Sequence, residues 1–453
     1  MRLLLPSLTL PILLASGLSS VHPARSASAQ PLLRPNILIV MTDDQRAGGT
    51  MNVMPKTREW FGESGTRFTR AFVSTPTCCP ARASIYTGRY THNHGVRTNR
   101  SIDELDHGST LQRYLQRAGY RTAFAGKFFN FWDLELSPPY FDRWAVFKGT
   151  RYYDVRVNAD GSQERVPDYI TTFVARYATD LIRDDFENDD LAPWLLYVAP
   201  LAPHMRATPE PRYRGAPVGR WRGNPAVRER DERDKPRYVR RIDHEIAEAR
   251  RIRTRQLRTL LSVDDLVDEV FRTLEDTGEL SNTLAFFVSD NGFMWAEHGL
   301  LGKSVPYTEA IRVPMMMRRP GLEAVPARDD RLASLVDIAP TALEAAGVVP
   351  DREFPIDGRS LLQPDERGFL LVENDARRWA SIRTRRYQYI EHFQRDGTGT
   401  TFSEYYDLRR DPWQLVNLFR DGDRTNDPDW QPLHRRLRRA TACAGTEPAG
   451  NCP

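Results

Sequence analysis

Three uninterrupted apolar runs stand out along the chain, at residues 36–41, 194–198 and 284–288. Each run is short and gives way abruptly to polar residues. A short apolar run without alternation is typical of a β-strand that is buried on both faces, as in parallel sheets. We therefore expect three inner strands whose carboxyl ends carry polar side chains.

Amphipathic helical patterns separate these runs, most clearly at residues 111–118 and 242–274. Strands that alternate with helices predict an α/β fold with a mostly parallel sheet flanked by helices. In open sheets of this kind, ligands bind beyond the carboxyl ends of the strands. The polar residues that follow the three runs are therefore the first candidates for a functional site.

The texture changes near the C-terminus, where shorter strand-like segments replace the helical patterns. Residues 396–399 read Asp-Gly-Thr-Gly, which predicts a tight turn between two of these segments. A small antiparallel sheet is therefore expected in this part of the chain. Its predicted strands cover residues 369–372, 379–393 and 402–408.

These patterns predict a catalytic domain over residues 34–349 and a C-terminal α+β subdomain over residues 367–440. The Pro- and Asp-rich stretch 350–366 would connect them. Residues 441–453 form a tail that contains Cys443 and Cys452. In an exported protein this pair is well placed to close a short disulfide loop.

The first 29 residues have the pattern of a secretory signal, with Arg2, an apolar stretch to Leu14 and small residues that end at Ala29. Pro6 and Pro11 interrupt the apolar stretch, which is also shorter than the roughly 20 residues of a membrane-spanning helix. We expect cleavage after Ala29 and no membrane anchor. The mature protein would then be secreted or periplasmic.

Charge patterning excludes some partners. The chain has 64 Lys and Arg against 60 Asp and Glu, and this near balance argues against a nucleic-acid binder. Residues 220–241 are densely charged with mixed signs, which favours a solvated face or an insertion loop. Only five of the basic residues are lysines, so Lys127 and Lys303, which lie in candidate site segments, suggest positions that need a compact charge.

Acidic and amide side chains follow two of the predicted strands. Asp43 and Asp44 are adjacent carboxylates that would repel each other unless a cation binds them, and Asp290 with Asn291 follows another strand. An all-oxygen set of this kind suits Ca²⁺ or Mg²⁺ better than zinc. Taken singly, such pairs are more often helix caps or turn residues.

A cysteine motif provides the strongest single signal. C-x-P-x-R occupies residues 78–82, and T-G-R follows at 87–89. By itself the pentapeptide is also compatible with an ordinary buried thiol or half of a disulfide. With the tail cysteines paired, Cys79 is expected to be a buried free thiol.

Together with the acidic residues, the cysteine motif makes the chain resemble the type I sulfatases across nearly all of the mature sequence. The N-acetylglucosamine-6-sulfatase-like group is the nearest. The resemblance implies an alkaline-phosphatase-like fold and a calcium ion, or alternatively Mg²⁺, held by Asp43, Asp44, Asp290, Asn291 and the modified Cys78. The segments that carry it are 34–45, 78–94, 126–127, 203–204, 290–292, 298–303 and 312–314.

The same resemblance implies a mechanism for hydrolysing sulfate monoesters of sugars or aryl alcohols. A formylglycine-generating enzyme would oxidise Cys78 to formylglycine, whose hydrated form attacks sulfur, gives a sulfated enzyme and then releases sulfate. Three cations are expected to neutralise the sulfuryl oxygens, and His204 is expected to protonate the departing alcohol. The three cations are Arg82, Lys127 and Lys303.

One position departs from the common sulfatase pattern. Many sulfatases have a histidine two or three residues after the lysine that matches Lys127, whereas this chain has Phe129 and Asn130. The group that resembles this chain most also has a Lys-x-x-Asn arrangement. Asn130 is therefore expected to bind substrate, with His94 and His298 as further candidates, and the base for sulfate release stays open.

Two other functions compete with sulfate-ester hydrolysis. A phosphomonoester or phosphonate hydrolase of the same superfamily would usually have Ser or Thr as nucleophile and bind zinc through several histidines, and the candidate ligands include no histidine. An inactive glycan-binding relative would be expected to lack the cysteine or a metal carboxylate, and this chain has both. The expected partners are thus a sulfated small molecule or glycan and the formylglycine-generating enzyme.

Overall fold

The protein is described here from a computed structural model, which covers residues 34–62, 65–186, 192–241, 245–321, 327–394, 396–397, 399–445 and 452–453. The expected signal peptide lies outside these residues. Among them, no helix combines the length and the apolar character needed to cross a membrane. Residues 34–453 form one compact unit.

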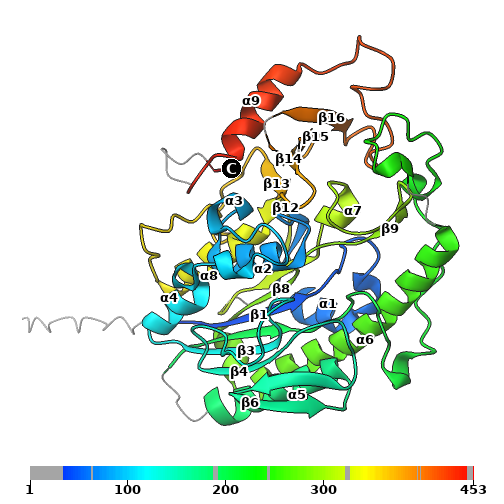
Figure 1. The fold of residues 1–453 in the computed structure, drawn as a ribbon. Helices are drawn as coiled ribbons and strands as arrows, with labels where there is room; N and C mark the ends of the chain where they lie inside the picture. Colours follow the sequence, from blue (N-terminus) through cyan, green and yellow to red (C-terminus); the bar gives the residue numbers. More distant parts are fainter. Residues whose placement is uncertain are drawn as a thin grey trace, which may run out of the picture. The chain divides into compact units, whose positions relative to one another are not determined.

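The elements of this unit follow the predicted alternation of strands and helices (Figure 1). The strands are β1 (Asn36–Thr42), β2 (Gly65–Phe72), β3 (Arg121–Lys127), β4 (Arg143–Phe147), β5 (Val155–Ala159), β6 (Ser162–Val166), β7 (Trp194–Ala199), β8 (Thr283–Ser289), β9 (Met294–Glu297), β10 (Leu300–Gly302), β11 (Met315–Arg318), β12 (Ala327–Ser334), β13 (Leu370–Asn374), β14 (Trp379–Arg383), β15 (Tyr387–Phe393) and β16 (Thr400–Asp407). The α-helices are α1 (Pro55–Gly62), α2 (Cys78–Thr87), α3 (Thr91–His94), α4 (Leu111–Arg117), α5 (Ile170–Asp180), α6 (Ile246–Asp276), α7 (Thr308–Ile311), α8 (Ile338–Ala346) and α9 (Trp430–Ala440).

A ten-stranded sheet forms the centre of the molecule, in the order β12-β2-β11-β8-β1-β7-β3-β4-β5-β6. The strands predicted from the three apolar runs, β8, β1 and β7, are parallel neighbours, and β3 and β4 continue the parallel run. In the described residues, the antiparallel pairings of this sheet are those of β11 with β2 and β8, of β4 with β5, and of β5 with the edge strand β6. The prediction of a mostly parallel sheet is confirmed.

Helices cover both faces of this sheet, as the apolar runs require. All seven residues of β1 are buried. Because successive side chains point to opposite faces of a strand, Ile37 and Ile39 pack with α2, α4 and α8, whereas Leu38 and Val40 pack with α1, α5 and α6. The two layers are visible on either side of the sheet in Figure 1.

The C-terminal antiparallel sheet is also present, with strand order β13-β14-β15-β16. One detail of the prediction is wrong, because residues 379–393 form two strands and not one. Thr384 Oγ1 accepts hydrogen bonds from the backbone N–H groups of Arg386 (3.0 Å) and Tyr387 (2.8 Å), which closes a turn between β14 and β15. The apolar pattern continues across this turn, so periodicity alone did not reveal it.

The tail packs against this second sheet. Cys443 and Cys452 form a disulfide, and both are buried with Leu437 of α9 against the sheet. Cys78 and Cys79 are free and buried. The boundaries at residues 349 and 367 stay a prediction, because both sheets belong to the same compact unit.

The charged stretch 220–241 is less solvated than predicted. Many of its arginines are exposed, but Lys235 is fully buried. Its ammonium group lies 2.9 Å from Glu229 Oε1 and 3.0 Å from Asp234 Oδ1, and it donates a 2.7 Å hydrogen bond to the backbone oxygen of Leu415. The two acids and the backbone oxygen of Leu415 compensate the cost of burying the charge of Lys235. The contact with Leu415 comes from a distant loop, so the spacing of residues in the sequence does not reveal it.

Candidate functional site

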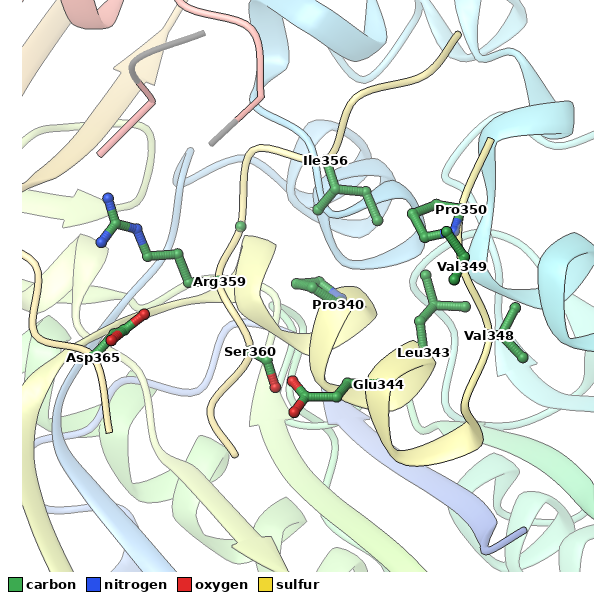
Figure 2. A pocket seen from close by; sticks show the side chains of 11 residues that line it. Pro340, Leu343, Glu344, Val348, Val349, Pro350, Ile356, Arg359, Ser360 and Asp365 are labelled. Atoms are coloured by element: carbon green, nitrogen blue, oxygen red, sulfur yellow. The ribbon is translucent and has the colours of Figure 1, made fainter. Parts of the chain in front are cut away.

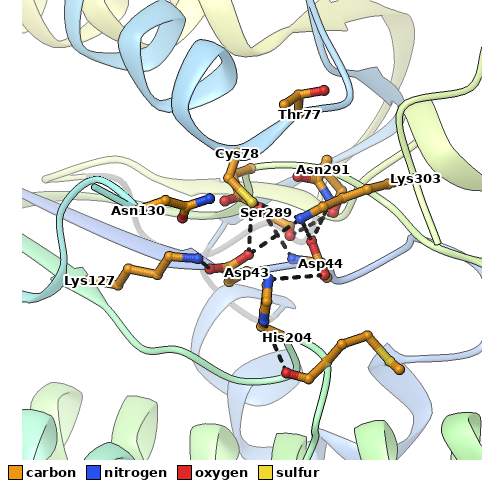
Figure 3. A network of polar contacts seen from close by, with 12 residues as sticks. Asp43, Asp44, Thr77, Cys78, Lys127, Asn130, His204, Ser289, Asn291 and Lys303 are labelled. Carbon is orange, nitrogen blue, oxygen red and sulfur yellow. Dashed lines mark hydrogen bonds and ion pairs between the residues drawn. The ribbon is translucent and has the colours of Figure 1, made fainter. Parts of the chain in front are cut away.

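The predicted site segments meet at the carboxyl end of the central sheet, because β8, β1, β7 and β3 are neighbours in that order. Asp43 and Asp44 follow β1, Asp290 follows β8, and His204 lies in the loop after β7. Lys127 is the last residue of β3. Figure 3 shows how Asp43, Asp44 and Lys127 converge with side chains from other loops.

Cys78 is the first residue of α2 and lies in the middle of this group, which we call the Cys78 cluster: Asp43, Asp44, Cys78, Arg82, Lys127, His204, Asp290, Asn291 and Lys303. Its Sγ atom is 3.5 Å from Asp43 Oδ1 and 2.7 Å from Lys303 Nζ. Burial raises the pKa of the Cys78 thiol well above its ordinary value, and Asp43 adds to the shift. Burial and Asp43 therefore disfavour the thiolate form of Cys78, whereas Lys303 and Lys127 favour it.

Acids and bases alternate through the cluster. Lys127 contacts Asp43, and Lys303 contacts Asp44. Burial alone would raise the pKa of Asp43, but Lys127, His204 and Arg82 hold it well below its ordinary value.

Asp290 is in a different electrostatic position. Its Oδ2 accepts a 3.0 Å hydrogen bond from Arg82 Nε, and its Oδ1 accepts one of 3.1 Å from the backbone N–H of Asp44. Burial and the neighbouring Asp43 nevertheless raise the pKa of Asp290 to about 6. Asp290 is therefore less well stabilised in its charged form than Asp43, and a cation placed beside it would lower its pKa.

The donor atoms form a possible metal site. Ligand atoms of Asp43, Asp44, Cys78 and His204 all lie within 4.8 Å of one another. Asn291 donates from Nδ2 to Asp44 Oδ1 (2.7 Å), while its Oδ1 atom is buried without a hydrogen-bond partner in the described part of the chain. A buried amide oxygen that lacks a donor, beside three carboxylates, fits a hard divalent cation.

His204 lies at the edge of the cluster, with Nε2 3.8 Å from Asp44 Oδ2. Its Nδ1 is 3.1 Å from the backbone oxygen of Met205, so Nδ1 carries the proton of the neutral ring. Burial lowers the pKa of His204, and Asp43 and Asp44 offset this only in part.

The three residues expected to bind substrate differ in position. Asn130 lies beside Cys78 with its amide turned toward the cysteine (Figure 3), and its Oδ1 is buried without a partner among the described residues. His94 is buried behind α2, where its ring bonds to Ser84 Oγ and to the backbone N–H of Val96. His298 is buried against Glu229. Neither histidine has a polar contact with the Cys78 cluster in the described residues.

Two supporting residues escaped the sequence analysis. Ser289 Oγ accepts a 2.9 Å hydrogen bond from the backbone N–H of Gln45, which ties the segment after β1 to the end of β8. Its position directly before Asp290 is a signal that could have found it. Asn99 Oδ1 accepts a 2.9 Å hydrogen bond from the backbone N–H of Cys79, and no local pattern indicates this contact.

A surface cavity of about 510 Å³ lies elsewhere, between α8 and the segment that follows it (Figure 2). Its lining is mixed, with Leu343, Val348 and Ile356 beside Glu344 and Arg359. No residue of the Cys78 cluster lines this cavity, so we do not connect it with the chemistry described above.

Comparisons with known proteins identify the family to which this chain is similar. The family model described as Sulfatase matches residues 35–348. Human N-acetylglucosamine-6-sulfatase is 31% identical over 358 residues, which cover 73% of this chain and 64% of the relative. The extracellular sulfatase SULF-1 homolog of Drosophila melanogaster is also 31% identical, over 75% of this chain and 32% of the relative. The chain thus spans about one third to two thirds of the length of these relatives.

A solved structure supports the fold. A protein whose structure was solved in complex with its substrate, D-glucosamine-2-N,6-O-disulfate, superimposes with a TM-score of 0.77 over 90% of this chain and 96% of that chain. The sequence identity is 24%, so this likeness concerns the fold alone.

Proposed function

Because this chain belongs to the sulfatase family, we propose that it is a sulfuric ester hydrolase that converts a sulfate monoester and water into an alcohol and inorganic sulfate. The observation that carries the proposal is the position of Cys78. It lies at the start of α2, in contact with Lys303 and 3.5 Å from Asp43. Cations and carboxylates thus surround the residue that matches the family's nucleophile.

In this proposal residue 78 acts as formylglycine, made from Cys78 by a formylglycine-generating enzyme. The position of the buried thiol supports this view, because Cys78 Sγ lies 2.7 Å from Lys303 Nζ and 3.5 Å from Asp43 Oδ1. When hydrated, the modified residue supplies one hydroxyl to attack sulfur and a second whose deprotonation expels sulfate.

Calcium is the proposed ion, with Mg²⁺ as the alternative, and Asp43, Asp44, Asp290 and Asn291 would hold it together with residue 78. The oxygen-rich donor set and the unpartnered Oδ1 of Asn291 support this assignment. Bound there, the cation would supply Lewis-acid stabilisation of the charged sulfate oxygens.

The remaining residues bind the ester and move protons. Arg82, Lys127 and Lys303 are buried or nearly buried cations, so their charges act on sulfuryl oxygens with little screening by water. His204 would protonate the leaving oxygen from Nε2, and the negative charge of a bound ester would favour the required protonated ring. The base for the release step stays unassigned.

A sulfated sugar is the proposed substrate. The support comes from the relatives named N-acetylglucosamine-6-sulfatase and from Asn130, which lies beside Cys78 where many sulfatases have a histidine. We also propose that the mature protein acts outside the cytoplasm, in keeping with the secretory pattern of residues 1–29 and the extracellular sulfatase among its relatives.

Mass spectrometry of the peptide that contains residue 78, combined with turnover of N-acetylglucosamine 6-sulfate, tests this proposal. We expect an aldehyde at position 78 in active protein and no turnover by Cys78→Ala. Cys79→Ala is the matched control, because Cys79 is an adjacent buried thiol with no proposed chemistry. Fully active protein with an unmodified thiol at residue 78 would disprove the mechanism.

A further inference from the structure

An exposed aromatic ring lies on the loop that follows Lys127. Phe131 is 50% exposed, whereas its neighbours Phe129 and Trp132 are 0% and 8% exposed. Trp132 also packs edge-on against Phe128, with ring centroids 4.9 Å apart. The loop is therefore anchored by buried aromatic rings, and the ring of Phe131 is half exposed beside them.

An arginine from a distant segment covers this ring. The guanidinium carbon of Arg100 lies 4.7 Å from the centroid of Phe131, within the range of a cation–π contact. Both side chains are exposed, and no acidic side chain of the described residues forms an ion pair with Arg100. The pair presents a half-exposed aromatic ring and a positive charge that no carboxylate of the described residues neutralises.

Both residues are tied to the neighbour of Cys78. Asn99, which precedes Arg100, accepts a 2.9 Å hydrogen bond from the backbone N–H of Cys79. The backbone N–H of Asn130, which precedes Phe131, donates to Cys79 Sγ at 3.3 Å. The residues that directly precede Arg100 and Phe131 therefore both contact Cys79, at the start of α2.

We propose that Arg100 and Phe131 form a subsite for an anionic sugar unit, next to the unit whose sulfate ester is cleaved. The apolar C–H face of a sugar ring can pack on Phe131, while its carboxylate or sulfate group accepts hydrogen bonds from the Arg100 guanidinium. The inference rests on the proposed function and deepens it. It makes the substrate an acidic oligosaccharide that extends at least one unit beyond the cleaved ester.

The test compares kcat/KM for four substrates: N-acetylglucosamine 6-sulfate, and three disaccharides in which this sugar is linked to a uronic acid, to the methyl ester of that uronic acid, or to a sulfated neutral sugar. For each disaccharide, the measured quantity is its kcat/KM divided by that of the monosaccharide. Arg100→Gln is expected to lower this ratio about tenfold for the two anionic disaccharides, mainly through KM. It should leave the ratio for the neutral methyl ester unchanged. Phe131→Ala should lower the ratio for all three disaccharides. The anionic disaccharide that loses most identifies the group bound by Arg100.

Leu136→Ala is the matched control, because Leu136 is 54% exposed and follows Phe131 in the same loop. It should leave every ratio unchanged. Equal losses on monosaccharide and disaccharides in Arg100→Gln, or no loss at all, would overturn the subsite.

Titration calorimetry with Cys78→Ala separates this inference from the proposed function. The anionic disaccharides should bind Cys78→Ala about tenfold more weakly when Arg100→Gln is added. This difference in binding tests the subsite even if the wild-type protein hydrolyses none of the sulfate esters. Absence of hydrolysis would disprove the proposed function and would not bear on the subsite. Equal binding by the two proteins would contradict the subsite.

Discussion

Two groups of buried charges lie in different parts of this molecule and differ in the kinds of side chains that they bring together. The Cys78 cluster gathers at the carboxyl end of the central sheet. A second group, which we call the Lys235 cluster, consists of Glu229, Asp234, Lys235 and His298 and joins the charged stretch 220–241 to the turn between β9 and β10. Both contain acids and bases with little exposure.

In the Lys235 cluster, the single ammonium group contacts two carboxylates and donates to a backbone oxygen, so its charge and its hydrogen bonds are used. His298 contacts Glu229. Such an arrangement fixes three distant segments to one another, because breaking it would leave charges buried without partners.

In the Cys78 cluster, by contrast, three carboxylates lie around a cysteine, together with an amide whose Oδ1 atom, in Asn291, has no donor among the described residues. The pKa of Asp290 is raised to about 6 although Arg82 contacts it. The comparison teaches that burial of charge alone does not mark a functional site. The kinds of side chains do, because carboxylate and amide oxygens that gather beside a cysteine at the carboxyl end of a sheet can hold a cation.

The largest expected effect follows from removing the cation from the Cys78 cluster. Chelation, or Asp290→Ala, should abolish measurable turnover of sulfate esters, while urea denaturation shows most of the stability retained because the ligands lie at strand ends. Asp103→Ala, which removes an exposed carboxylate, is the control. Calcium and not zinc should restore activity after chelation. Full activity in calcium-free protein would show that the Cys78 cluster needs no added cation for turnover.

Removing His204 should lower the rate of hydrolysis more for substrates with poor leaving groups than for substrates with good ones. We expect His204→Ala to lose roughly 100-fold to 10,000-fold in rate on sulfated sugars, the usual contribution of a positioned proton donor, and much less on nitrophenyl sulfate. Arg82→Ala and Lys127→Ala should depress both rates alike. Steady-state kinetics on the two substrates measure the difference, and equal losses in His204→Ala would leave His204 as a sulfate-binding residue.

Lys235→Met should have the opposite outcome, with stability lost and chemistry retained. The change leaves two carboxylates buried without their cation, which costs about 3 to 5 kcal/mol of unfolding free energy in typical cases. Denaturant titration measures the loss, and kcat per folded molecule should stay near the wild-type value. Lys148→Met, at an exposed lysine, is the control. A stable but inactive Lys235→Met protein would contradict the structural role of this cluster.

A smaller effect is expected where α3 meets the C-terminal sheet, in the pair formed by His92 and Glu373. Nδ1 of His92 lies 2.8 Å from Glu373 Oε1. Burial lowers the pKa of His92, but Glu373 raises it by more. The pKa of His92 therefore lies above its ordinary value. The pair therefore contributes fully below the unfolded-state pKa of about 6.5 and loses its contribution as pH rises through the higher folded-state pKa.

The variant His92→Gln tests that sign. It should cost about 1.5 to 3 kcal/mol at pH 5.5, the usual range for a hydrogen bond to a charged group, and less at pH 9. Urea titrations of both proteins at the two pH values measure this. A deficit that grows with pH would show that the histidine is neutral in the folded protein.

The sequence by itself determined the inner strands and the candidate ligands. Runs such as residues 36–41 can be satisfied only by burial on both faces, so their strands, and the position of Asp43 and Asp44 at a strand end, follow from local pattern. The cysteine motif at residues 78–82 indicated the family by the same local means. The turn at Thr384 was not predicted, because a hydrogen bond between a side-chain hydroxyl and the backbone does not change the hydrophobic pattern of the sequence.

Only the tertiary structure decided which of these groups meet and how fully they are paired. The partners of two lysines are an example, because Lys235 pairs with Glu229 inside the charged stretch 220–241, whereas Lys303 contacts Cys78. The contact of Asn99 with Cys79 likewise joins segments that carry no common motif. Burial and electrostatic pairing depend on distances between chain segments far apart in sequence, and these distances are set by packing of the whole sheet and its helices.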